Sequence, residues 1–259
     1  MKTLTVVKIG GNIVDKPEAL QLFLHDFQQM EGPKLLIHGG GILASQLSEK
    51  LGIAVTMQNG RRVTDAQTLR IVTMVYAGLV NKQIVAALQE AGCNAIGLSG
   101  ADGNSVPAVR RPAEPFDWGF VGDVTPDGIN TALLNILFEQ RLCPVFCAIT
   151  HDTHGSLLNT NADTMASSLA RALARTYAVR LIYCFEKDGV LSDPCDDGSV
   201  IPLITPGIYR QLLERQIVAG GMIPKLDNAF AALADGVSEV IIKHARNLSN
   251  DKGTVLRKE

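Results

Sequence analysis

Three glycine-rich turns lie beside residues that could bind an anion. They are Lys8-Ile9-Gly10-Gly11, His38-Gly39-Gly40-Gly41 and Gly220-Gly221-Met222-Ile223-Pro224-Lys225. Glycine lets backbone N–H groups approach a negatively charged group closely, and lysine adds a compact positive charge. Each lysine taken alone could also be an ordinary surface charge. Together the three turns predict a site for phosphate or carboxylate groups.

Two further segments contain polar side chains that could also bind a phosphate or carboxylate group. Asn159 and Asp163 flank Asn161, the expected N-cap of a helix that follows a buried strand. Arg61 and Arg62 could hold a carboxylate through paired hydrogen bonds. Each feature also has a structural interpretation, because an acid in the first helical turn complements the helix dipole and adjacent arginines are common in exposed loops.

Known nucleotide-binding and nucleophile motifs are mostly missing. The chain has no Gly-x-x-x-x-Gly-Lys-[Ser/Thr] and no Gly-x-Ser-x-Gly, which excludes a P-loop NTPase and a nucleophile elbow. Residues 39–44 match the alanine-ended form of the dinucleotide fingerprint. Its acidic partner should end the next strand, whereas Asp65 is expected at the start of a long helix. Nicotinamide or flavin binding is therefore the alternative interpretation of this turn.

Short β-rich runs alternate with helix-period segments over nearly the whole chain, which predicts an α/β fold with a mostly parallel sheet. Thr64 and Gln67 form a capping box that predicts a long helix ending near Gly92. The Gly-, Pro- and Arg-rich residues 99–125 predict short hairpins, either a lid or, as composition favours, a solvated surface excursion. The expected strands are residues 4–9, 34–38, 95–98, 144–149, 179–185 and, last, 239–242. The expected helices begin at or near residues 17, 42, 65, 130, 161, 207 and 224.

Composition restricts the class of protein. Lys and Arg number 24 against 26 Asp and Glu, so the net charge of −2 offers no field for a nucleic acid. No uninterrupted apolar run reaches the ~20 residues of a membrane span, and no signal peptide is recognised, so we expect a cytoplasmic protein without a membrane partner. Five cysteines are typical of reduced, buried thiols. His151 and His154 beside Asp152 are read as a loop rather than a metal site.

The motifs together resemble the amino acid kinase family, and within it the branch that phosphorylates N-acylglutamates. Besides the three turns, the resemblance rests on the segments at residues 59–64, 97–100 and 159–163, all in the family's order. It covers essentially the whole chain. The resemblance implies a three-layer αβα sandwich around a mostly parallel open sheet. It also implies an N-terminal lobe, residues 1–178, for acylglutamate binding and dimerisation, and a C-terminal lobe, residues 179–259, for the nucleotide.

The implied reaction transfers the ATP γ-phosphoryl group to the side-chain carboxylate of an N-acylglutamate, N-acetyl by default, in arginine biosynthesis. By the family's pattern Lys8 and Lys225 stabilise the transition state and Asp163 positions them. The implied substrate-binding residues are Gly40, Gly41, Arg62 and Asn159. The implied nucleotide-binding residues are Gly10, Gly11, Glu186, Lys187, Asp188, Gly189, Val190, Leu191, Ile217, Val218 and Ala219. No protein metal site is implied, because Mg²⁺ should arrive bound to ATP.

Two departures from the family pattern lead to expectations. Phe185-Glu186-Lys187 stands where the family usually has Ser/Thr-Asp-Val, which affects the expected adenosine contacts rather than the reaction. The sequence begins directly in the first strand, without the N-terminal helix of arginine-sensitive hexameric relatives, so we expect a homodimer that arginine does not inhibit.

The sequence leaves several alternatives open. They are N-succinylglutamate as the acceptor, with Arg110-Arg111 near its second carboxylate, and a sister kinase acting on carbamate, aspartate, glutamate or uridylate. An inactive sensor with a kinase fold and a dinucleotide-binding oxidoreductase are the alternatives from other classes.

Overall fold

A computed structural model describes residues 1–58, 60–218 and 222–259. Its central sheet has eight strands in the described chain, in the order β12-β14-β13-β11-β1-β2-β8-β5. All neighbouring strands are parallel except β13 and β14. The strands are β1 (Thr3–Ile9), β2 (Lys34–His38), β5 (Ala95–Leu98), β8 (Cys143–Cys147), β11 (Ala178–Phe185), β12 (Leu203–Ile204), β13 (Glu239–His244) and β14 (Thr254–Leu256).

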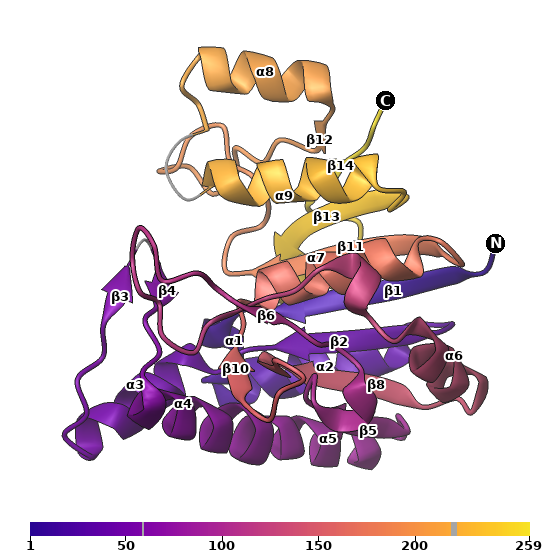
Figure 1. Cartoon of the computed structure of the whole chain (residues 1–259). Coiled ribbons are helices and arrows are strands. Elements are labelled where there is room, and N and C mark those ends of the chain that lie inside the picture. The colour runs from indigo at the N-terminus through magenta and orange to yellow at the C-terminus, as the bar shows by residue number, and fades with distance from the viewer. Residues whose placement is uncertain (59, 219–221) are drawn as a thin grey trace.

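Helices cover both faces of this sheet, as Figure 1 shows for α4 and α5 on one side of β1 and β2 and α7 on the other. The first layer contains α1 (Gly11–Val14), α2 (Pro17–Gln29), α3 (Gly41–Lys50), α4 (Ala66–Thr73), the π-helical η1 (Met74–Val80) and α5 (Asn81–Glu90). The second contains α6 (Thr131–Glu139), α7 (Ala162–Leu173), α8 (Pro206–Glu214) and α9 (Met222–Ala234). The expected three-layer αβα sandwich is confirmed.

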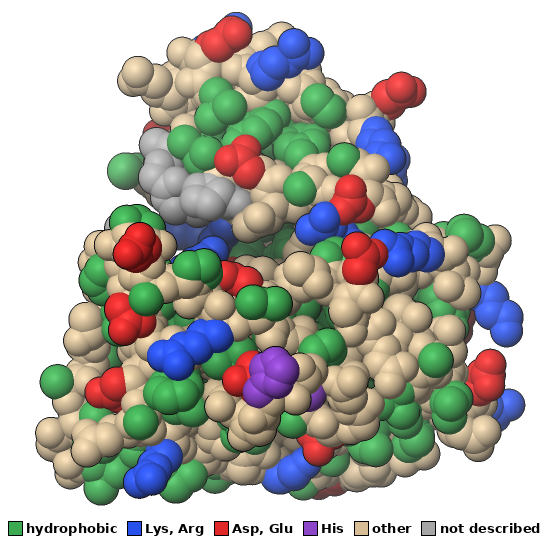
Figure 2. All heavy atoms as spheres, in the orientation of Figure 1, with side chains coloured by type: hydrophobic (Ala, Val, Ile, Leu, Met, Phe, Trp, Pro, Cys, Tyr) green, Lys and Arg blue, Asp and Glu red, His purple; other side chains and the backbone are tan. Residues whose placement is uncertain are grey.

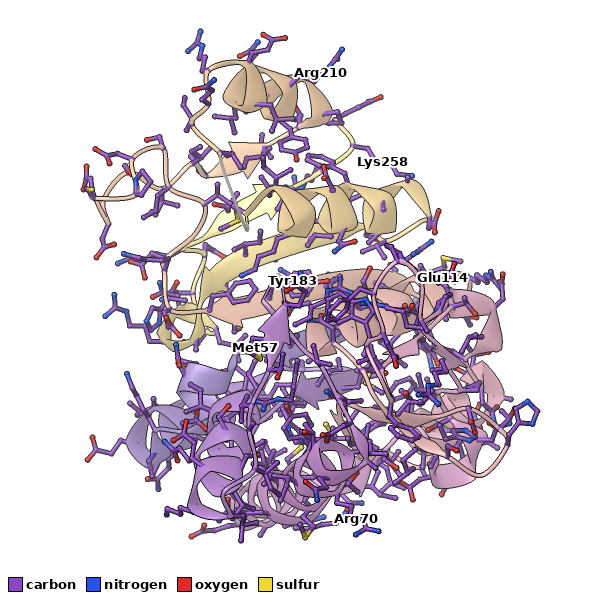
Figure 3. The ribbon with its side chains drawn as sticks, turned by 60° about the vertical axis from the view of Figure 1, so that its left-hand side comes forward. Met57, Arg70, Glu114, Tyr183, Arg210 and Lys258 are labelled. Atoms are coloured by element: carbon purple, nitrogen blue, oxygen red, sulfur yellow. The ribbon has the colours of Figure 1, made fainter. Side chains whose placement is uncertain are left out.

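Successive side chains of the central strands enter opposite cores, because side chains alternate across a sheet. Val6 of β1 packs with the α7 side, whereas Val7 packs with the α2–α5 side. Phe146 and Val145 of β8 divide in the same way. Figure 3 places Arg70 of α4 and Arg210 of α8 at opposite ends of the molecule, with Tyr183 of β11 between them.

Short elements extend from the ends of the sheet. They are the antiparallel pairs β3 (Met57–Gln58) with β4 (Arg61–Arg62), β6 (Val109–Arg110) with β7 (Gly122–Asp123), and β9 (Ile149–His151) with β10 (Leu157–Asn159). The 3₁₀ turns are η2 (Asp102–Asn104), η3 (Pro126–Gly128) and η4 (Ala245–Asn247). In Figure 1 the β3–β4 hairpin stands at the side toward which β1 runs.

Three expectations about elements are wrong. Asp65, not Thr64, caps α4, since its Oδ1 accepts from the Thr68 N–H at 2.7 Å. The sheet continues beyond residue 242, where the chain turns back and adds β14 antiparallel to β13. Residues 99–125 are more than a solvated excursion, because Val106 and Val121 are buried.

The helix from Ala66 to Glu90 is long and apolar enough to meet a membrane-span test of length and composition. Val72, Tyr76, Ile84 and Leu88 are buried against the sheet, which explains this hydropathy as that of a core helix. In Figure 2 acidic and basic side chains are interspersed on the face shown, in keeping with the small net charge.

A buried histidine fixes the glycine turn after β2. His38 Nδ1 lies 2.7 Å from the Gly39 carbonyl, and its Nε2 lies 3.1 Å from Asn81 Nδ2, which also donates to the Val145 carbonyl. This pattern needs a neutral ring that donates from Nδ1 and accepts at Nε2. Burial lowers the pKa of His38 to about 4, so the ring stays neutral.

We expect this histidine to make stability depend on pH. Its folded pKa lies below the ordinary value of about 6.5, so the unfolded chain binds the proton first as the pH falls. The contribution, about 3 kcal/mol by this difference in pKa, is present above pH ~6.5 and is lost toward pH ~4. Urea titrations should show that His38→Gln loses less stability than the wild type between pH 7 and pH 4.5.

His25→Gln is the matched control, because His25 is exposed. Its stability should follow the wild type over the same pH range. An unchanged pH dependence in His38→Gln would contradict this account.

Candidate functional site

The carboxyl end of β1 brings Lys8 to Asp163, as predicted. Lys8 is buried, and its Nζ lies 2.7 Å from Asp163 Oδ1 in the first turn of α7. Asn161 caps this helix by accepting from the Thr164 N–H, which fixes the turn that carries Asp163. Asp163 Oδ1 accepts no hydrogen bond from the described residues, so the contact with Lys8 is an ion pair rather than a directed bond.

Lys225, in the first turn of α9, approaches the same place from the C-terminal half of the chain. Its Nζ lies 3.7 Å from the centre of the Phe185 ring, and Lys8 Nζ lies 4.9 Å from that centre. Burial lowers the pKa of Lys225, and Lys8 adds to this while Asp163 and Glu186 oppose it. Two ammonium groups and one paired carboxylate leave an excess positive charge, which suits a polyanion.

Phe185 was expected only as a departure from the family pattern. Its ring accepts both lysines through cation–π contacts, which lets two like charges lie close together in a partly desolvated site. In the sequence, only the position of Phe185 at the end of a buried strand could have indicated that it is a site residue.

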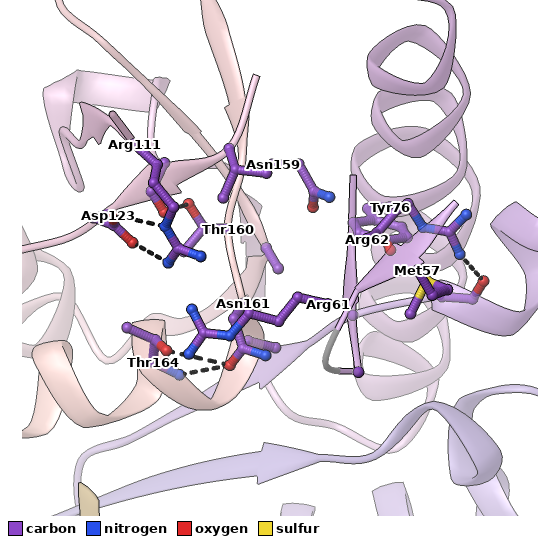
Figure 4. A pocket seen from close by; sticks show the side chains of 17 residues that line it. Met57, Arg61, Arg62, Tyr76, Arg111, Asp123, Asn159, Thr160, Asn161 and Thr164 are labelled. Atoms are coloured by element: carbon purple, nitrogen blue, oxygen red, sulfur yellow. Dashed lines mark hydrogen bonds and ion pairs between the residues drawn. The ribbon is translucent and has the colours of Figure 1, made fainter. Parts of the chain in front are cut away.

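A cavity of about 180 Å³, the arginine cavity, lies beside the carboxyl ends of β2 and β8 (Figure 4). Predicted residues Gly41, Arg62 and Asn159 line it. Arg62 is buried and donates from Nη2 to the Gly41 carbonyl at 2.8 Å and to Ser45 Oγ at 2.7 Å. Its Nη1 has no hydrogen-bond partner among the described residues. An unpaired guanidinium nitrogen in a cavity wall suits a carboxylate ligand.

Asn159 and Thr64 are linked across the cavity wall. Asn159 Nδ2 donates to Thr64 Oγ1 at 2.9 Å, and the Thr64 hydroxyl donates to the Arg62 carbonyl at 3.1 Å. Because the Thr64 hydroxyl is bonded to Asn159 and to the Arg62 carbonyl, the adjacent Asp65 caps the helix. Asp65 is thus bound to the Thr68 N–H and does not end a strand, so the dinucleotide interpretation loses its acidic residue.

Gly40 lies behind this cavity rather than in its lining. A Cβ there would lie 2.9 Å from the Tyr76 ring, so the π-helical turn that carries Tyr76 can pack closely only against glycine.

Two further arginines reach the arginine cavity from segments far apart in the sequence. Arg111 pairs with Asp123 on the β6–β7 segment, with Nε 3.0 Å from Oδ2. Arg61 points toward Asn161 in Figure 4. Burial and the nearby Arg111 charge lower the pKa of Arg61, while Asp123 and Asp163 oppose this shift. Asp123 was not predicted as a site residue, and Arg111 was expected only as part of the pair Arg110-Arg111 near the second carboxylate of an N-succinyl acceptor.

The arginine cavity joins a second cavity of about 280 Å³, which contains Asp163, Phe185 and Lys225 and which we call the lysine cavity. The two share Gly60, Arg61, Asn161 and Thr164 in their linings. Carboxylate-binding and cationic groups therefore lie next to one another, as an anion-to-anion transfer requires.

Two cavities of about 240 and 220 Å³ continue from the lysine cavity into the C-terminal half of the chain. Predicted residues Gly10, Glu186, Lys187 and Gly189 line the larger one with Lys225. The smaller one is lined by Lys187, Gly189, Val190, Leu191, Ile217 and Val218 among others. Most of the nucleotide-binding residues that the sequence predicted thus lie together.

Three of the predicted nucleotide contacts are placed differently. The Gly10 N–H donates to the Cys184 carbonyl at 3.1 Å, so this amide is already bonded, and Gly11 lines none of these cavities. The Asp188 carboxylate accepts from Asn247 Nδ2 at 3.0 Å and pairs with Arg246, and Asp188 lines neither C-terminal cavity. Ala219, Gly220 and Gly221 fall outside the described residues.

No group of three or more metal-binding side chains of His, Cys, Asp or Glu occurs in the described residues. Asp152 Oδ1 accepts from the N–H groups of His154 and Ser156, which is the geometry of an ordinary loop. The one carboxylate at the lysine cavity, Asp163, is committed to Lys8.

The chain is similar to known proteins over nearly its whole length. Residues 3–244 match the amino acid kinase family. The chain is 52% identical over 255 residues to an acetylglutamate kinase of Phocaeicola vulgatus, covering 98% of each protein. It is also 52% identical over 249 residues to an acetylglutamate kinase of Cytophaga hutchinsonii, covering 96% of this chain and 94% of that protein.

Among solved structures, the protein smu.665 of Streptococcus mutans superposes with a TM-score of 0.79 at 28% identity, with 99% of each chain covered. The sheet order, the cavities at its carboxyl edge and these matches agree. The chain belongs to the amino acid kinase family.

Proposed function

We propose that the chain transfers the γ-phosphoryl group of ATP to the γ-carboxylate of N-acetylglutamate, as an acetylglutamate kinase of arginine biosynthesis. The observation that carries the proposal is the lysine cavity, whose lining residues Lys225 and Asp163 lie between the arginine cavity and the C-terminal cavities, with Lys8 paired to Asp163. Relatives that carry the name acetylglutamate kinase, about 50% identical over nearly the whole chain, support it.

The chemistry needs charge neutralisation more than proton transfer. A glutamate γ-carboxylate has a pKa of about 4.3 and is ionised at neutral pH, so no general base is required. A carboxylate oxygen forms a bond to the γ-phosphorus while the bond to the oxygen bridging the β- and γ-phosphates breaks, which gives an acyl phosphate and ADP. Lys8 and Lys225 stabilise the charge on the transferring oxygens, and Asp163 holds Lys8 in place.

We assign the substrate α-carboxylate to Arg62, because its Nη1 is buried and unpaired among the described residues. Asn159 is assigned to the amide portion of the substrate. Gly41 keeps the cavity wall after β2 free of a side chain, so that the γ-carboxylate can approach the backbone, while Gly40 behind it lets Tyr76 pack closely.

The nucleotide is assigned to the two C-terminal cavities, lined by Glu186, Lys187, Gly189 to Leu191, Ile217 and Val218. Mg²⁺ is proposed to arrive on the phosphates, where it would neutralise their charge. The pairing of Asp163 with Lys8 supports this assignment.

The lobes, residues 1–178 and 179–259, are proposed to divide these roles between acylglutamate and nucleotide. Two copies are proposed to associate through the N-terminal lobe, where the α4–α5 helix exposes Met74 and Leu79. We propose a cytoplasmic location, in keeping with the five free cysteines.

The reaction is tested by ADP release with ATP and Mg²⁺ and by hydroxylamine trapping of the acyl phosphate. The acceptors to compare are N-acetylglutamate, N-succinylglutamate, free glutamate, aspartate and carbamate. Turnover should be fastest with N-acetylglutamate. Lys8→Met and Lys225→Met should each lower kcat by about 10²- to 10³-fold, because each removes a charge from the transition state.

Lys50→Met, on the exposed last turn of α3, is the matched control and should keep wild-type kcat. Circular dichroism would verify that all variants fold. Faster turnover of another acceptor would reject the assigned substrate, and activity retained without Lys8 would reject the assigned mechanism.

Arg62→Ala tests the substrate site separately. Loss of a charged hydrogen bond costs about 1.5–3 kcal/mol, so KM for N-acetylglutamate should rise at least 10-fold while KM for ATP stays within about twofold. Arg110→Ala is the matched control, since Arg110 is exposed and lines none of these cavities. Equal increases in both KM values would place Arg62 outside the acylglutamate site.

A further inference from the structure

A separate cavity of about 430 Å³ lies at the opposite edge of the sheet, where the parallel strands begin. Its lining includes Lys34 at the start of β2, Cys143 at the start of β8 and Cys93 after α5. None of these residues lines the cavities at the carboxyl edge. The mechanism above therefore leaves both cysteines unused.

Backbone pairing places the two cysteines side by side. Ala95 is paired with Cys143 in the parallel β5–β8 ladder, and the Cys143 N–H donates to the Asn94 carbonyl at 2.9 Å. Cys93 lies at the turn just before this pair, its carbonyl accepting from the Ala95 N–H at 2.7 Å. Both thiols are free and both line this cavity, and Cys143 Sγ donates to the Lys34 carbonyl at 3.5 Å.

Lys34 provides a positive charge beside this pair. Its Nζ donates to the carbonyls of Phe27, Gln28 and Met30 at 2.6–2.8 Å, which fixes the ammonium group at the end of α2. Nearby positive charge favours a thiolate over a thiol.

The two thiols differ in acidity. The neighbouring Cys143 thiol holds the pKa of Cys93 below the ordinary thiol value, with help from Lys34 and against the effect of burial. The Cys93 thiol in turn, together with burial, raises the pKa of Cys143. Neither Cys147 nor Cys184 has a neighbouring thiol within the described chain, and burial raises the pKa of each to about 12.

We propose that Cys93 and Cys143 form a peroxide-reactive dithiol, a modification site separate from the kinase site. Cys93, open to the cavity and next to Lys34, is the attacking group, and Cys143 is the resolving thiol. This proposal does not rest on the proposed function.

The chemistry uses one hydrogen peroxide for each pair. The Cys93 thiolate sulfur attacks one peroxide oxygen, the O–O bond breaks, and the departing hydroxide takes a proton to form water. Cys143 sulfur then attacks the Cys93 sulfenic acid, the S–O bond breaks, and the S–S bond forms with release of a second water. Two thiols are oxidised by two electrons and the peroxide is reduced to two waters.

The test treats the reduced wild-type protein with stoichiometric hydrogen peroxide and follows it by intact mass and peptide mapping. We expect a loss of about 2 Da, the mass of two hydrogen atoms, a peptide that joins Cys93 to Cys143, and reversal by dithiothreitol. Absence of the joined peptide, or a disulfide through Cys195 instead, would overturn the proposal.

Single variants separate the two roles. In Cys143→Ser the sulfenic acid on Cys93 has no resolving thiol, so dimedone labelling of Cys93 should rise at least 10-fold over the wild type. In Cys93→Ser the Cys143 thiol should stay unlabelled. Cys195→Ser, which removes an exposed thiol, is the control and should form the disulfide as the wild type does.

The rate of iodoacetamide alkylation gives an independent readout that needs no variant. Alkylation of Cys93 should be half-maximal below pH ~8.5, the ordinary thiol value, and at pH 7.5 at least 10-fold faster than that of Cys147 or Cys184. Equal rates for all the buried cysteines would contradict the assigned role of Cys93.

Discussion

Two lysine ammonium groups lie against one aromatic ring at the carboxyl edge of the sheet, and most of the site follows from holding these like charges together. Lys8 comes from β1 and Lys225 from α9, and Phe185 accepts both. Asp163 pairs with Lys8 and offsets part of the charge. The remaining positive charge suits a polyanion, whose negative charge would offset the repulsion between the two ammonium groups.

The parallel sheet makes this arrangement possible. Strands β1, β2, β8 and β11 run in one direction, so their carboxyl ends meet at one edge, and residues from distant parts of the sequence come together there. The arginine cavity lies at the ends of β2 and β8 and the larger C-terminal cavity at the end of β11, with Lys8 on the strand between them. In the proposed function, transfer between two anions needs only a short step across β1.

Rigid packing supports the glycine turns. Neutral His38 and Asn81 fix the turn after β2, and the π-helical turn brings Tyr76 against Gly40. A side chain at Gly40 would displace Tyr76, and a proton on His38 Nε2 would face the Asn81 Nδ2 donor. The other edge of the same sheet, where strands begin, carries Lys34 and the paired cysteines. The two edges have different chemistry because they gather different strand ends.

Local chemistry in the sequence determined most elements and much of the site. Pro17 begins α2, Asn161 caps α7, and the glycine turns end β1 and β2, because caps and turns depend on neighbours within four residues. Tertiary structure decided the rest. The Asn159 amide donates to Thr64, and Asp65 caps the helix. Arg111 and Asp123 reach the arginine cavity, and Cys93 and Cys143 line one cavity. These contacts join residues far apart along the chain, and only the packed sheet sets their distances.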